Sequence, residues 1–75
     1  MSSPRILIVD DDEGALSMYR AMLKSAGFTV DIAATASTAI KKAEVFSYDL
    51  IFTDLMLPDL DGYALLTELR RMGLN

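Results

Sequence analysis

The sequence predicts a single α/β domain built on a small parallel sheet. Short apolar or alternating runs typical of strands alternate with segments of helical period, in the order β-α-β-α-β-α. The connections are too short for anything but crossover helices between parallel strands. Two of the strand runs are apolar throughout and one alternates, which favours the strand order 2-1-3, with the alternating second strand at an edge. A chain of 75 residues has room for one core.

The first predicted strand covers residues 6–9, an uninterrupted apolar run that ends at Asp10. A helix is expected from Gly14 to Ala26, because apolar residues recur there at spacings of three and four. Gly27 supplies the left-handed residue that commonly follows a helix. The expected apolar positions of this helix are Leu16, Tyr19, Met22, Leu23 and Ala26.

The second predicted strand, residues 28–32, alternates apolar and polar side chains, as is typical of an edge strand. A second helix follows, for which Thr35 and Ser37 are both plausible N-caps. Its apolar stripe is expected to comprise Ala36, Ala39, Ile40, Ala43 and Phe46.

The third predicted strand, residues 50–53, is again strongly apolar and is interpreted as buried on both faces. A third helix is expected after residues 54–60, capped by Asp61 and ending at Gly73. Its inward positions are expected to be Leu65, Leu66 and Leu69.

Composition excludes several classes of function. The chain has no histidine and no cysteine, so it cannot form a zinc finger, a disulfide framework, a thiol nucleophile or an imidazole base. A net charge of −4 argues against generic binding to nucleic acid. The longest apolar run is far short of the ~20 residues that span a bilayer. Residues 1–5 lack the apolar segment of a secretory signal, so a cytoplasmic location is expected.

Carboxylates follow the two apolar strands at the edge where ligands bind in open α/β sheets. Asp10, Asp11 and Asp12 follow the first strand, and Asp54 follows the third. Converging carboxylates repel one another unless a cation compensates, and Mg²⁺ is the hard cation that such oxygens bind. A carboxylate can also attack phosphorus to give an aspartyl phosphate, and Asp54 is placed for this role.

A structural interpretation of these acidic residues remains open beside the functional one. Asp near a helix N-terminus satisfies free N–H groups and interacts favourably with the helix dipole. Capping or simple solvation is the favoured interpretation for Asp12, Glu13 and Asp61. For the set Asp10, Asp11 and Asp54, the residue pattern alone leaves capping and a functional site equally open.

Several motifs together resemble the receiver domain of two-component response regulators. The resemblance runs almost from end to end and needs no gap. The motifs that carry it are Ile6-Leu7-Ile8-Val9-Asp10-Asp11-Asp12, Gly27-Phe28-Thr29-Val30, Ala39-Ile40, Tyr48-Asp49-Leu50-Ile51 and Asp54-Leu55-Met56-Leu57-Pro58-Asp59-Leu60-Asp61-Gly62.

The resemblance implies a flavodoxin-like fold with three αβα layers and a signalling domain rather than an enzyme. It implies that Asp54 accepts a phosphoryl group from the phosphohistidine of a histidine kinase. It further implies that Asp11 binds Mg²⁺ directly, that Asp10 does so largely through water, and that the main-chain carbonyl of Met56 is another ligand. Leu57 departs from the family, which usually has Met there, and this is an apolar exchange of similar volume.

The resemblance also implies that residues 1–75 form one partial receiver domain. Two of the family's five βα units are not represented, including the Ser or Thr after the fourth strand and the Lys after the fifth. Phosphotransfer is therefore expected to be impaired. The third strand, residues 50–53, would be an unpaired apolar edge, which predicts a homodimer or higher oligomer.

Two alternatives belong to other classes. The chain could be an excised or engineered half-domain that folds and self-associates without phosphotransfer. It could also be a phosphohydrolase of the haloacid dehalogenase type, because Asp59-Leu60-Asp61-Gly62 echoes the Asp-x-Asp-Gly motif of those enzymes. The latter is disfavoured, since Tyr63 stands at the expected Thr position and Met56-Leu57-Pro58 separate the motif from the strand.

Overall fold

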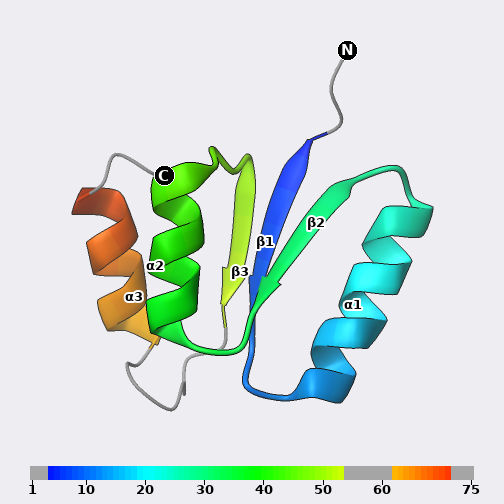
Figure 1. The fold of residues 1–75 in the computed structure, drawn as a ribbon, viewed down its shortest axis with the longest axis horizontal. Coiled ribbons are helices and arrows are strands. Elements are labelled where there is room, and N and C mark those ends of the chain that lie inside the picture. The colour runs from blue at the N-terminus through cyan, green and yellow to red at the C-terminus, as the bar shows by residue number, and fades with distance from the viewer. Residues whose placement is uncertain (1–3, 54–61, 72–75) are drawn as a thin grey trace.

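A computed structural model describes residues 4–53 and 62–71 and confirms the α/β architecture. Strands and helices alternate along these residues in the predicted order (Figure 1). The elements are β1 (Arg5–Val9), α1 (Glu13–Ser25), β2 (Thr29–Ala33), α2 (Ala36–Val45), β3 (Leu50–Thr53) and α3 (Gly62–Arg71).

The described strands form one parallel sheet in the order β2-β1-β3, which confirms the predicted order. The apolar strand β1 is central, and the alternating strand β2 lies at an edge. β1 pairs with β2 from Arg5 opposite Thr29 onward, and with β3 from Ile6 opposite Leu50 onward.

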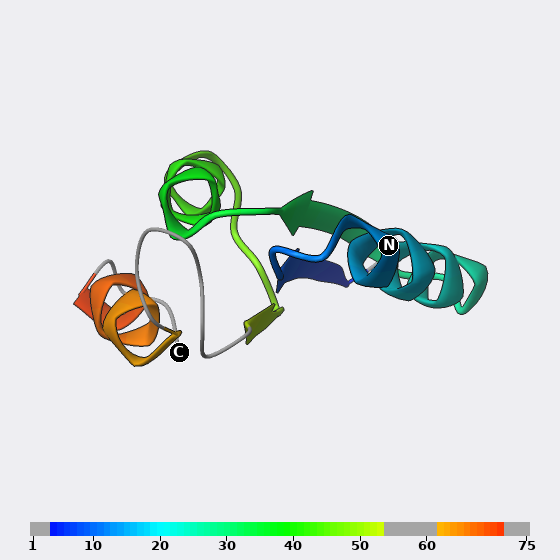
Figure 2. The same cartoon turned by 90° about the horizontal axis from the view of Figure 1, so that it is seen from below.

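Helices cover the two faces of the sheet unequally. α1 lies on one side, beside β2, and α2 and α3 lie on the other (Figures 1 and 2). Because successive side chains of a strand point to opposite faces, β1 contributes to a buried cluster on each face of the sheet. On the α2 and α3 side the buried cluster is Leu7, Val9, Ala33, Ala36, Ala39, Leu65 and Leu69. On the α1 side it is Ile6, Ile8, Leu16 and Val30.

The prediction that residues 50–53 are buried on both faces is wrong. Ile51 is half-buried and packs against the core beneath α2 and α3. Leu50 and Phe52, which point the other way, keep 46% and 52% of their surface exposed. The reason is the position of α1, which lies over β1 and β2 rather than β3, so no described helix covers the face of β3 to which Leu50 and Phe52 point.

The same arrangement corrects the expected inner face of α1. Leu16 is buried and Leu23 is half-buried, as predicted. Tyr19 and Met22 are 42% and 61% exposed, and Ala26 is also exposed. The sequence period identifies the apolar side of the helix correctly, but half of that side has no described partner.

The local signals for helix ends are confirmed where the structure describes them. The Asp12 carboxylate caps α1 by accepting hydrogen bonds from the backbone N–H groups of Gly14 and Ala15, at 2.9 and 3.3 Å. Gly27 has a φ of 98°, in the left-handed region that favours glycine. Thr35, rather than Ser37, caps α2.

The third helix is confirmed in its inward positions Leu65 and Leu69, both of which are buried. Its predicted cap, Asp61, and its predicted end, Gly73, lie outside the described residues, as does the side chain of Leu66.

Candidate functional site

The carboxyl end of β1 carries two of the predicted site residues. The Asp10 N–H group donates to the Ala33 carbonyl at 3.1 Å, which ties the end of β1 to the end of β2. The side chain of Asp10 is half-buried, and its Oδ1 accepts a hydrogen bond from the Asp12 N–H at 3.0 Å. Asp11 is exposed. One backbone turn therefore presents two adjacent carboxylates at the end of the central strand.

β3 ends beside the same point. Val9, the last residue of β1, is paired with Thr53, the last residue of β3. Asp54 comes directly after Thr53 in the sequence, but Asp54 and Met56 lie outside the described residues. The structure thus brings together the ends of β1 and β3, the strands after which the predicted metal ligands and the predicted acceptor follow in the sequence. Of the four predicted site residues, it describes Asp10 and Asp11.

The donors at this end of the sheet are compatible in kind with Mg²⁺. Carboxylate oxygens are the ligands that this ion takes, usually one or two of them with several waters. Within residues 4–53 and 62–71, no group of three ligating side chains could hold a metal ion. Asp10 and Asp11 alone are thus the described part of any such site.

An open groove of about 580 Å³ begins at Asp10 and runs between α1 and β3. Most of its lining is apolar and includes Tyr19, Met22 and Phe52, the side chains left exposed beside the uncovered face of β3. This lining suits a packing surface better than the binding of a small charged substrate.

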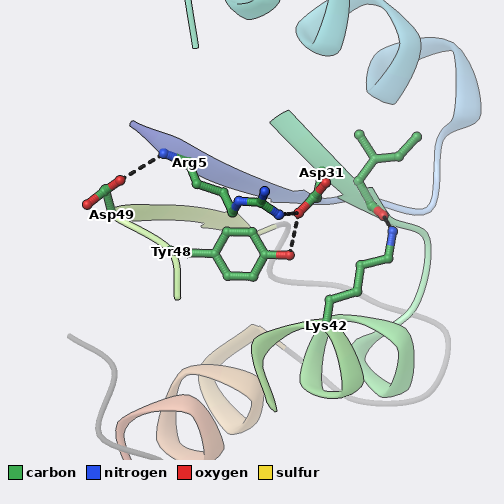
Figure 3. A network of polar contacts seen from close by, with 6 residues as sticks. Arg5, Asp31, Lys42, Tyr48 and Asp49 are labelled. Atoms are coloured by element: carbon green, nitrogen blue, oxygen red, sulfur yellow. Dashed lines mark hydrogen bonds and ion pairs between the residues drawn. The ribbon is translucent and has the colours of Figure 1, made fainter. Parts of the chain in front are cut away.

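A polar network that the sequence prediction missed lies at the opposite end of the sheet (Figure 3). The Arg5 guanidinium donates to Asp31 at 3.0 Å, and the Tyr48 hydroxyl donates to the same carboxylate oxygen at 2.7 Å. The backbone N–H of Arg5 donates to the Asp49 carboxylate at 2.8 Å, and the Asp49 N–H donates back to the Arg5 carbonyl at 2.8 Å. The network joins β1, β2 and the segment that leads into β3.

Aromatic contacts complete this network. The Arg5 guanidinium lies 4.2 Å from the centroid of the Phe46 ring, a cation–π contact. Phe46 packs edge-on against Tyr48, and it remains 42% exposed, so its predicted place on the inner stripe of α2 is wrong. From the same helix, the Lys42 ammonium donates to the Ile32 carbonyl at 2.5 Å (Figure 3). A charged residue inside a predicted strand, Asp31, was the sequence signal for this network, because such a charge needs a partner.

Burial raises the pKa of the Tyr48 hydroxyl above its usual value, and the hydrogen bond to Asp31 and the charge of that carboxylate add to the effect. Arg5 acts in the opposite sense but is outweighed. Tyr48 therefore stays protonated in the folded chain at pH values where a solvated tyrosine ionises.

Stability is expected to fall when the pH rises above about 10, the pKa of tyrosine in an unfolded chain. A pKa raised by folding stabilises the fold fully below the unfolded value, and this contribution is lost as pH rises through the folded value. Urea denaturation of the native chain and of Tyr48→Phe, from neutral to alkaline pH, checks this. The variant should lose less stability over the alkaline range, and equal losses in the two proteins would contradict the assignment.

In the parts of the chain that the structure describes, no helix has the length and apolar character needed to cross a bilayer.

The matching family profile and a similar solved structure are both of response regulator receiver domains, and two sequence relatives are transcriptional regulators. The sequence profile of one family, described as "Response regulator receiver domain", matches residues 6–75. The chain is 40% identical over 70 residues to the alkaline phosphatase synthesis transcriptional regulatory protein PhoP of Bacillus subtilis, covering 93% of this chain and 29% of that protein. It is 41% identical over 69 residues to the transcriptional activator protein PfeR of Pseudomonas aeruginosa, covering 92% of this chain and 23% of that protein. The chain thus spans less than a third of the length of these relatives.

Among solved structures, the chain is similar to a CheY-like response regulator receiver domain protein from Methanospirillum hungatei. The TM-score is 0.94 at 38% identity, and the match covers 99% of this chain and 61% of that one. The flavodoxin-like fold expected from the sequence is confirmed by this likeness.

Proposed function

Because this chain belongs to the response regulator receiver domain family, we propose that it is a phosphoacceptor domain of two-component signalling and that Asp54 is the acceptor. The observation that carries the proposal is the pairing of Val9 with Thr53. It brings the strand end that bears Asp10 and Asp11 beside the strand end that Asp54 follows in the sequence. This is the edge of an open α/β sheet at which ligands bind.

The proposed reaction moves one phosphoryl group between two proteins. A carboxylate oxygen of Asp54 attacks phosphorus, an O–P bond forms, and the P–N bond to the phosphohistidine of a histidine kinase breaks. The product is an acyl phosphate on Asp54 and a free histidine on the kinase. In the turn that follows β1, the Asp12 N–H donates to the Asp10 carboxylate and so holds it next to Asp11.

Asp11, the main-chain carbonyl of Met56 and, largely through water, Asp10 are proposed to hold Mg²⁺ together with Asp54. When bound, the ion supplies positive charge that neutralises the transferring oxygens. Asp10 and Asp11 support this proposal because carboxylate oxygens are the ligands that Mg²⁺ takes.

Phosphorylation is expected to require both Asp54 and Mg²⁺, and intact-mass measurement with acetyl phosphate tests this. Attack by Asp54 releases acetate and leaves one phosphoryl adduct on the chain. The native chain should gain that adduct in Mg²⁺, whereas Asp54→Asn, or the native chain with a chelator, should not. An adduct retained by Asp54→Asn would show that another residue is the acceptor.

The rate for these 75 residues alone is expected to be low. The Lys that the family places after its fifth strand is not among them, and removing one electrostatic donor typically costs about 10²–10³ in rate. We also propose that the chain acts in the cytoplasm and has no activity as an enzyme beyond its own phosphorylation. Cell fractionation and an assay with a small aryl phosphate test these two points.

We propose in addition that the 75-residue chain forms a homodimer or higher oligomer through β3. β3 is an edge strand of the described sheet, and both Leu50 and Phe52 are about half exposed on it. Such an edge offers unpaired backbone groups and an apolar face to a second copy. Should the folded chain self-associate and yet gain no phosphoryl adduct, the alternative of a half-domain that only folds and associates would be favoured.

Phe52→Lys is expected to convert the oligomer into monomers, because it places a charge on the proposed contact. Met18→Lys is the matched control, since Met18 is also 52% exposed but lies on α1. Light scattering at micromolar concentration should show a dimer or larger species for the native chain and the control, and a monomer for Phe52→Lys. A monomeric native chain would refute association through β3.

A further inference from the structure

We propose that Asp49 is a positioning residue that fixes the register of β3 against β1 and thereby sets where Asp54 stands relative to Asp10 and Asp11. The inference rests on the proposed function of Asp54. Its structural half, that Asp49 fixes the register, can be tested without any phosphorylation.

The apolar pattern of β3 does not choose a register by itself. The strand begins with three apolar residues in succession, Leu50, Ile51 and Phe52. A slip by one residue turns every side chain to the other face. A slip in one direction would put Leu50 in the place of Ile51 against the core under α2 and α3, an apolar exchange of similar volume that cores tolerate well. A slip in the other direction would put the larger Phe52 there. Burial of apolar surface alone therefore does not exclude the slip that places Leu50 against the core.

Asp49 distinguishes the registers through two reciprocal hydrogen bonds to one residue. Its carboxylate accepts the Arg5 N–H at 2.8 Å (Figure 3). Its own N–H donates to the Arg5 carbonyl, also at 2.8 Å. Both backbone groups of Arg5 are thus paired with a single residue immediately before β3. A slipped strand would bring an apolar side chain, or the ring of Tyr48, to this position, and neither carries a carboxylate to accept the N–H.

The β1 side of this contact is itself held in place. Arg5 is paired with Thr29 in the β1–β2 register. Its guanidinium binds Asp31 and lies on the ring of Phe46. Arg5 is therefore a fixed reference on the central strand, and Asp49 aligns β3 to it.

The register set at one end of β3 is transmitted to the other end because the strand is short. β3 runs from Leu50 to Thr53, and Thr53 pairs with Val9 one residue before Asp10. A one-residue slip displaces the strand by about 3.3 Å along the sheet. Asp54 follows Thr53 directly in the sequence, so a slip of β3 is expected to move it relative to the proposed metal ligands Asp10 and Asp11. A misplacement of about 1 Å can already cost 10²-fold in rate.

The test compares Asp49→Ala with Asp49→Asn and Asp31→Ala in the 75-residue chain. Asp49→Asn keeps an oxygen that can accept the Arg5 N–H. Asp31→Ala also removes a carboxylate bound to Arg5, but one that contacts the side chain and not the backbone. Through-space NMR contacts between Val9 and Thr53 and between Ile6 and Leu50 report the register. Adduct formation from acetyl phosphate, expressed per folded molecule from circular dichroism, reports the placement of Asp54.

Asp49→Ala is expected to lose the native β1–β3 contacts and to slow adduct formation about 10²-fold. Asp49→Asn should restore both, and Asp31→Ala should keep the native contacts. The proposal is overturned if Asp49→Ala keeps those contacts and the native rate, or if Asp31→Ala shifts the register equally. If Asp49→Ala does not fold, Asp49→Val replaces it, because the Val side chain favours strands. If both variants are unfolded, Asp49 is required for folding as such, and the proposal that it selects the register is overturned.

The two proposals fail in different ways. If the native chain gains no adduct, the phosphoacceptor function is lost, while the NMR contacts still decide whether Asp49 sets the register. If the register changes in Asp49→Ala without any change in adduct rate, Asp49 does not position Asp54.

Discussion

Leu7→Ala is expected to cost about 2–5 kcal/mol of the free energy of unfolding, which would leave the chain at the limit of stability. Leu7 is fully buried in the central strand and belongs to the core that α2 and α3 cover. The loss combines the transfer free energy of the removed side-chain carbons with the cost of the cavity left behind. A chain of this length has a total stability of roughly 4–11 kcal/mol, so a single cavity removes a large share of it.

Urea denaturation followed by circular dichroism measures this effect. Val45→Ala is the matched control, because Val45 is 74% exposed and an exposed truncation should change stability by no more than about 0.5 kcal/mol. Equal midpoints for Leu7→Ala and Val45→Ala would mean that the face of the sheet under α2 and α3 is not the principal core.

Removing the Asp11 carboxylate is expected to raise the Mg²⁺ concentration needed for phosphorylation by about 100-fold or more. Loss of a group that merely supports a metal ligand typically costs about 10–100-fold in metal affinity, and a direct ligand should cost at least as much. Asp10 is proposed to bind the ion largely through water, so Asp10→Ala should raise the required Mg²⁺ concentration by only about 10–100-fold. The rate of adduct formation from acetyl phosphate, measured across a Mg²⁺ series, gives both values.

Glu13→Gln is the control for this experiment. Glu13 is an exposed acidic residue in the first turn of α1, two residues from Asp11, and it is not a proposed ligand. It should leave the Mg²⁺ dependence unchanged. If Glu13→Gln shifted the dependence as far as Asp11→Ala does, the effect would be a general attraction of cations by acidic charge and not coordination.

The periodicity of apolar residues and the local signals for helix ends were enough to predict the strands and helices and the order of the strands in the sheet. The apolar run at residues 6–9 and the alternation at residues 28–32 correctly separated the central strand from an edge strand. Gly27 was correctly predicted to follow a helix, and Asp12 and Thr35 were among the candidate caps, because a cap depends on residues within one turn of it.

Apart from Phe46, which stands just past the end of α2, the incorrect predictions concern contacts between distant elements. The pattern of apolar residues marks Tyr19, Met22 and Phe52 as residues that could be buried. Burial also needs a packing partner, and no described element lies over them. Likewise, the shared hydrogen bonds of Asp31 with Arg5 and Tyr48 depend on which residues the strand register brings together. Spacing along the chain does not contain that information.

For the candidate site, the structure tests the placement of two residues and not their roles. The order 2-1-3 and the acidic residues after the apolar strands were enough to locate Asp10 and Asp11 at the carboxyl end of β1. The proposed role of Asp54 as acceptor rests on its place after the third apolar strand and on the family resemblance, and Asp54 lies outside the described residues.

The sequence separation of the two strand pairings has a consequence for the order of folding. Arg5 meets Asp31 across 26 residues, whereas it meets Asp49 across 44. Closing the longer loop costs more chain entropy, so the β1–α1–β2 unit is expected to form first and β3 to dock on it later. Destabilising changes in β3 should then mainly accelerate unfolding, and those in the β1–α1–β2 unit should slow refolding. The strand that leads to Asp54 would thus be the last to join the sheet and the first to leave it.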